Sequence, residues 1–174
     1  PLADLILEQK GIDPAAEAAA YVDPEKQVDS VEDALAGARD IIAEIVNEND
    51  VARSRVRDLF LIRATISSRV IAGMESSGAK FKDYFEWQEP FAKVPSHRLL
   101  AMRRGEKENI LILDFEPSES EALAILEKLF VKGDGLDADQ VQMAVVDSYK
   151  RLLSNSMETE ARVHSKTKAD REAI

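Results

Sequence analysis

A short acidic stretch is the first place where this sequence could do chemistry. Asp114, Glu116, Glu119 and Glu121 lie within eight residues of one another. Clustered carboxylates can bind a divalent cation or serve as an acid and base pair. No histidine lies at a metal-binding spacing here, and helix N-termini attract acidic residues through the helix dipole alone. We therefore expect no metal site. If these acids did bind a metal ion, the protein would instead be a metal-dependent nuclease.

Other catalytic patterns are missing from the sequence. There is no cysteine, and the two histidines, His97 and His164, do not lie at the spacing of a triad or a zinc site. The stretch from Asp134 to Asp139 lacks the ligand order of a calcium loop, and no glycine-rich phosphate loop occurs. We expect no catalytic residue, no cofactor and no enzymatic activity.

A basic and aromatic segment is the strongest candidate for binding. Residues 51–107 hold 12 Lys and Arg against 6 Asp and Glu, whereas residues 1–50 hold 3 against 13 and residues 108–174 hold 8 against 14. Five of the ten aromatic residues lie between Phe81 and Phe91. Cations with a stacking ring bind single-stranded nucleic acid. The predicted contacts are Lys80, Lys82, Trp87, Arg98, Arg103, Arg104 and Lys107. The structural alternative is that the rings pack into the core and the arginines pair with neighbouring acids.

Composition limits the class of protein. The 174 residues carry a net charge of -10, which argues against a general basic coat for phosphate binding. No apolar run reaches the ~20 residues of a membrane span, and no signal peptide is visible. The absence of cysteine suits a reducing compartment. These features predict a soluble, cytoplasmic protein without a membrane partner.

Helical periodicity dominates the chain. Apolar spacings of three and four residues predict helices over 30–49 and 50–73, with Ser30 and Asp50 as caps and a short link that favours a hairpin. A capping box at Ser118 opens a helix to Phe130, and a similar spacing at Asp137 opens another to about Leu153. A last helix is expected to start at Ser156.

One segment has the pattern of a strand. Residues 110–115 are short, apolar and β-branched, and lie between a turn-like stretch from Gly105 to Asn109 and Pro117. Its partner is predicted either at 99–103, across a turn at Gly105, or elsewhere, if Ser96 instead caps a short helix through Arg103.

One long ordered run lies in the centre of the chain. It comprises Gly78 to Phe85, Trp87, Glu89-Pro90, Val94 to Ala101 and Arg103 to Glu108. Further stretches to compare are Asp40 to Glu44, Ser148 to Leu153 and Glu158 to Glu160. Together these stretches resemble the Tex family of bacterial transcription accessory proteins, and the resemblance covers most of residues 30–174.

The resemblance implies a mainly α, multi-helix scaffold with helical hairpins and one short β element near 110–115. It divides the chain into an N-terminal helical segment, 1–29, and a scaffold region, 30–174, that ends before the family's RNase H-like domain. It implies RNA or DNA binding by the full-length protein, with the missing domains as intramolecular partners. It points to no catalytic residue in this region. The alternative is a protein-interaction module, in which the acidic helices 30–50 or 118–153 recruit a partner in the transcription machinery and would leave an apolar helical groove exposed.

Overall fold

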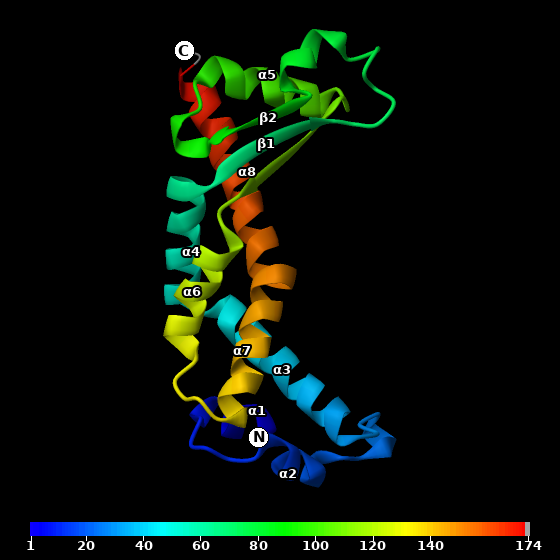
Figure 1. The fold of residues 1–174 in the computed structure, drawn as a ribbon, viewed down its shortest axis with the longest axis vertical. Helices are drawn as coiled ribbons and strands as arrows, with labels where there is room; N and C mark the ends of the chain where they lie inside the picture. Colours follow the sequence, from blue (N-terminus) through cyan, green and yellow to red (C-terminus); the bar gives the residue numbers. More distant parts are fainter. Residues whose placement is uncertain (173–174) are drawn as a thin grey trace. The chain divides into compact units, whose positions relative to one another are not determined.

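The computed structural model describes residues 1–172 and divides into two compact units. Unit 1 comprises residues 1–56 and 120–154, and unit 2 comprises residues 57–119 and 155–174. The described part is mainly helical, with eight α-helices and one small antiparallel sheet (Figure 1). Residues 1–29 thus share a unit with the helix that follows them. No helix within residues 1–172 is long and apolar enough to cross a membrane.

Unit 1 is helical. Its elements are α1 (Leu2–Glu8), α2 (Pro14–Ala18), α3 (Val31–Glu48), most of α6 (Glu119–Phe130), α7 (Leu136–Ser148), and the first half of α4 (Asp50–Arg63). Two 3-10 turns, Ala19–Tyr21 and Pro24–Lys26, join α2 to α3. α3 packs on α7, where the buried hydroxyl of Ser148 donates to the Ala43 carbonyl oxygen at 2.7 Å. Ser30 caps α3, as the sequence predicts.

Two polar side chains fasten the start of the chain to the rest of unit 1. The Gln9 side-chain oxygen accepts from the backbone amides of Lys132 and Gly133, at 2.7 and 3.1 Å. Asp137, 1% exposed, accepts from the amide of Gly11 at 2.8 Å. Asp137 is not the cap residue that the sequence predicts, because α7 begins at Leu136 and Gly135 holds the cap position. The other carboxylate oxygen of Asp137 accepts from the amide of Ala138 in the first turn, at 2.9 Å.

Unit 2 contains a three-stranded antiparallel sheet in the order β2-β1-β3. The strands are β1 (Thr65–Val70), β2 (Glu86–Pro90) and β3 (Leu111–Glu116). In the register, Ser68 lies between Trp87 on one side and Leu113 on the other. β3 confirms the predicted strand. Of the two alternatives for 99–103, the strand is wrong and the helix is confirmed, since those residues lie in α5 (Ser96–Lys107), which also contains Gly105. The residue at the cap position of α5 is Pro95 and not Ser96.

The predicted helix over 50–73 is correct only to Arg63. Beyond it, Thr65 to Val70 form the central strand β1, which hydrogen-bonds to neighbours on both sides. Ile66 and Val70 are four residues apart, a spacing that also fits one face of a helix, so periodicity could not distinguish the two. The cap of α4 is Asn49 and not Asp50, since the Asn49 side chain accepts from the amide of Ala52 at 2.9 Å.

The two faces of the sheet differ sharply. One face is apolar and buried, with Ile66, Leu113 and Phe115 packed under α5 and the last helix, α8 (Ser154–Glu172). The opposite face presents polar side chains to solvent. α8 follows a π-helical turn, Tyr149–Leu153, so Ser156 lies inside its first turns and the predicted cap there is wrong.

Short 3-10 segments complete unit 2. One, η3 (Ala79–Tyr84), precedes β2, and another, η4 (Phe91–Lys93), follows it. Phe91 and Phe115 meet edge to face with ring centroids 5.3 Å apart, so the second segment closes the buried face of the sheet. Gly105 brings α5 close to β3, because a Cβ there would lie 2.4 Å from Cδ1 of Leu111.

Candidate nucleic-acid interface

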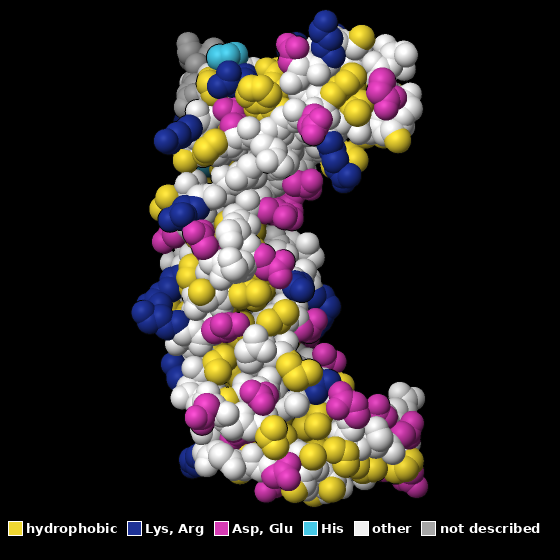
Figure 2. Space-filling model, in the orientation of Figure 1, with side chains coloured by type: hydrophobic (Ala, Val, Ile, Leu, Met, Phe, Trp, Pro, Cys, Tyr) yellow, Lys and Arg dark blue, Asp and Glu magenta, His cyan; other side chains and the backbone are white. Residues whose placement is uncertain are grey.

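The seven predicted binding residues all lie in unit 2, on η3, β2 and α5. The structure separates them by their partners. Four have side chains engaged with other parts of unit 2, and three are exposed cations. On the face shown in Figure 2, Lys and Arg side chains are interspersed with Asp and Glu side chains.

Arg98 and Trp87 belong to one cluster around Glu89. The Arg98 guanidinium donates to both carboxylate oxygens of Glu89, at 3.0 and 3.3 Å, and the Trp87 indole N–H donates to the same carboxylate at 3.1 Å. The guanidinium also lies 5.5 Å from the Trp87 ring centroid. Because Arg98 occupies a face of that ring, Trp87 is less open to a stacking base than the sequence predicts.

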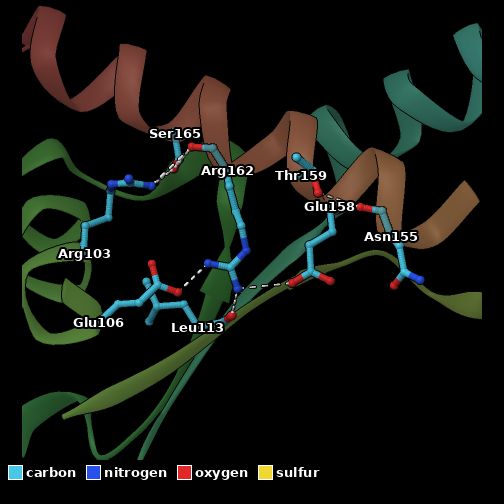
Figure 3. Close-up of polar contacts among 8 residues, drawn as sticks. All are labelled: Arg103, Glu106, Leu113, Asn155, Glu158, Thr159, Arg162 and Ser165. Carbon is cyan, nitrogen blue, oxygen red and sulfur yellow. Dashed lines mark hydrogen bonds and ion pairs between the residues drawn. The ribbon is translucent and has the colours of Figure 1, made fainter. Parts of the chain in front are cut away.

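Arg103 extends toward α8. Its guanidinium donates to the Ser165 hydroxyl at 2.9 Å and to the backbone carbonyl of Arg162 at 3.2 Å (Figure 3). Ser165 is fully buried. Arg103 therefore fastens α5 to α8, which is the structural alternative that the sequence left open.

Arg162 is the centre of a larger cluster that the sequence analysis did not identify. Its guanidinium donates to Glu106 on α5, to the backbone carbonyl of Leu113 on β3, and to Glu158 one turn earlier on α8 (Figure 3). It also lies 5.2 Å from the Phe115 ring centroid. Burial lowers the pKa of Arg162, but the hydrogen bonds and charges of Glu106 and Glu158 together outweigh it and raise that pKa above its ordinary value. Only the Glu158 contact, at a spacing of four residues, could be recognised from sequence.

Lys80 pairs with Glu108, with 2.8 Å between the ammonium nitrogen and the carboxylate. Both side chains are well exposed, so the pair is weak, but it places η3 beside the C-terminal end of α5. Gly78 fits against Ile110 in the same region, because a Cβ there would lie 2.1 Å from that side chain.

The remaining three cations are Lys82, Arg104 and Lys107. All are exposed, and none of their side chains has a hydrogen bond or ion pair with another residue in the described part of the chain. Arg104 and Lys107 are three residues apart on α5 and share a face with exposed His97 and Leu100. We call these four residues the α5 outer face. Lys and Arg in the last turn of a helix also complement its dipole, which is a structural reason for their presence.

The open face of the sheet is less suited to phosphate. A depression of about 600 Å³ there is lined by Trp87 and by polar side chains, among which Arg69 is accompanied by the acids Glu86 and Asp114. Partial burial raises the pKa of nearby Glu116, and the carboxylates of Glu158, Asp114 and Glu119 raise it further. Neighbouring carboxylates repel a phosphate. Within residues 1–172, no three His, Asp or Glu side chains are grouped so that they could hold a metal ion.

Comparison with known proteins gives the family of the chain. Residues 9–174 match the family model described as Tex central region-like. The chain is 39% identical to YdcI of Bacillus subtilis, a match that includes all of this chain and 25% of that protein. It is 38% identical to protein tex of Bordetella pertussis, over 79% of this chain and 18% of that protein.

A further relative is the transcriptional accessory protein Tex of Neisseria gonorrhoeae. It is 33% identical over the whole of this chain and 24% of its own length. The chain thus spans about a quarter or less of these relatives. The family model and the relatives agree over nearly all of its residues, and the chain belongs to the Tex family.

Proposed function

We propose that this chain is a non-catalytic scaffold of a Tex-like transcription accessory protein and that its α5 outer face contacts RNA or DNA in the full-length protein. The observation that carries the proposal is the pair Arg104 and Lys107, exposed on one helix face without an ion-pair partner among the described residues. Lys82, on the segment next to α5, is a third candidate contact. The bacterial relatives support a cytoplasmic location.

The contact is expected to be weak in this chain alone. Two or three cations neutralise few phosphates, and the net charge of -10 opposes an anion at long range. We expect a dissociation constant of about tens of micromolar or worse at physiological salt, with an affinity that falls as salt rises. The remaining domains of the full-length protein would supply most of the affinity.

Fluorescence anisotropy with a labelled single-stranded RNA tests this surface, and labelled duplex DNA is measured in parallel. Arg104→Glu removes a predicted contact, and Lys128→Glu is the matched control, an equal charge change at an exposed lysine on α6. We expect Arg104→Glu to weaken binding several-fold and to lower the salt slope by about 0.7, the value for one lost phosphate of a single strand. Equal losses of affinity in the two variants would mean that net charge alone accounts for the effect. That result would refute the α5 outer face as the nucleic-acid contact.

The absence of catalysis is the second part of the proposal. Nuclease and nucleoside-triphosphatase assays with magnesium or manganese are expected to give no turnover. Turnover that Asp114→Asn or Glu121→Gln abolishes would refute it, because these carboxylates are the acids from which a metal-dependent site would be built.

A further inference from the structure

A groove on unit 1 is lined mainly by apolar side chains and has a volume of about 470 Å³. Its walls come from the start of α1, the turns between α2 and α3, and the first half of α3. Tyr21 and Val22 line one side, and Ala34, Ala38 and Ile41 line the other. All of these residues belong to unit 1. We call this feature the N-terminal groove.

The apolar surface extends beyond the groove along α3. Ile41 is 51% exposed and Ile45, one turn later, is 39% exposed. In Figure 2, hydrophobic side chains gather over the elements near the N-terminus, with acidic side chains around them. Contiguous exposed apolar surface is uncommon in proteins that have no partner for it. An occupant that covers both isoleucines would remove this surface from water.

Gly37 leaves the groove open on the α3 side. A Cβ placed there would have no neighbouring heavy atom within 4 Å. The residue lines the groove between the turns of α3 that carry Ala34 and Ile41. A larger side chain at Gly37 would therefore occupy groove volume without displacing the protein's own atoms.

The charge around the groove indicates the chemistry of its occupant. Asp23 and Asp33 line it, and Asp40 and Glu44 continue the acidic row along exposed α3, where Arg151 interacts electrostatically with the last two. Residues 1–50 hold 13 Asp and Glu against 3 Lys and Arg. Two of these three cations are already paired, Lys10 with Glu8 and Arg39 with Glu32. The third, Lys26, lines the groove, where the two aspartates outnumber it. The surroundings favour a positively charged occupant and disfavour nucleic acid.

We propose that the N-terminal groove binds an amphipathic helix of a protein partner, with apolar anchors on one face and Lys or Arg beside them. A helix is a suitable occupant because Ala34, Ala38 and Ile41 form an apolar stripe of α3 along one wall, and helices pack side by side through such stripes, as in helix-in-groove recognition. Apolar anchors would cover Ile41, and flanking cations would meet Asp33 and Asp40. This interaction goes beyond the nucleic-acid contact and uses a different unit of the chain.

The test measures anisotropy of a labelled model peptide of Leu and Lys, with leucines at helical positions i, i+3, i+4 and i+7. Any purification tag is kept away from Pro1, because Pro1 lines the groove. Gly37→Leu fills the groove, and Ser54→Leu, at an exposed position of α4, is the control for added hydrophobicity. We expect Gly37→Leu to weaken binding at least tenfold and Ser54→Leu to change it less than twofold.

Folding does not confound this comparison. Leucine is a better helix former than glycine, so Gly37→Leu should keep or raise the melting temperature while it loses binding. The same peptide with Glu in place of Lys should bind at least tenfold more weakly. Three results would each overturn the proposal. They are equal binding by the wild type and Gly37→Leu, equal binding of the two peptides, and a protein dimer that Gly37→Leu dissociates, which would make a second copy the occupant.

Discussion

Replacing Arg162 by methionine should destabilise unit 2 by more than the loss of an exposed surface ion pair would. The substitution keeps much of the apolar stem but removes the donors to Glu106, the Leu113 carbonyl and Glu158. The Arg162 side chain is 31% exposed and Glu158 is 19% exposed, so water compensates only partly. Hydrogen bonds to charged groups contribute about 1.5–3 kcal/mol each. With partial solvation, we expect a loss of about 3 kcal/mol in the free energy of unfolding.

Trp87 makes the measurement specific. It is the only tryptophan and lies on β2, so its fluorescence during urea unfolding reports unit 2. Arg57→Met is the matched control, since Arg57 also pairs with an α8 acid, Glu160 at 2.6 Å, but both side chains are 40% exposed. We expect that control to cost at most about 1 kcal/mol. Equal losses in the two variants would refute the view that the Arg162 cluster holds α5 and β3 against α8.

Two further predictions concern packing and pH. Gly105→Ala should lower the free energy of urea unfolding of unit 2 by about 1 kcal/mol, because a clash with Leu111 outweighs the gain in helix propensity. Gly37→Ala has open space around it and should raise the free energy of unfolding by about 1 kcal/mol. Stabilisation by both substitutions would contradict the close approach of α5 to β3. Glu116→Gln should raise the melting temperature at pH 7, because its raised pKa means that the folded state disfavours the ionised carboxylate. That gain should disappear as pH falls through the raised pKa and below the ordinary value of 4.5, and a gain unchanged at low pH would refute it.

The helical part of the fold could be predicted because its signals are local. Ser30 precedes α3 and its hydroxyl accepts from the amide of Asp33 at 3.1 Å, as the cap residue and the acidic first turn indicate. α6 begins directly after Ser118, at the predicted capping box. Both features depend on residues a few positions apart, which sequence spacing describes completely.

The sheet could be predicted only in part, because a strand depends on its neighbours. β3 could be recognised because its apolar run, Leu111 to Leu113, lies in a segment too short for a typical helix and is bounded by a turn-like stretch and by Pro117. β1 carries Ser67, Ser68 and Arg69 in its centre, and these residues have no strong strand preference. Its conformation is set by backbone hydrogen bonds to β2 and β3 on both sides, which no local pattern contains.

The binding residues show the same limit on a smaller scale. Charge counting located the basic segment, but it could not tell a cation with a partner from one without. Arg103 and Arg104 are neighbours in sequence, yet one donates to Ser165, 62 residues away, and the other faces solvent. Helical period separates them, because adjacent residues on a helix point about 100° apart. Arg104 and Lys107, three residues apart, are brought together by that same period. A charge reversal at Arg103 would therefore disturb the contact between α5 and α8, so a change at Arg104 tests nucleic-acid binding without that ambiguity.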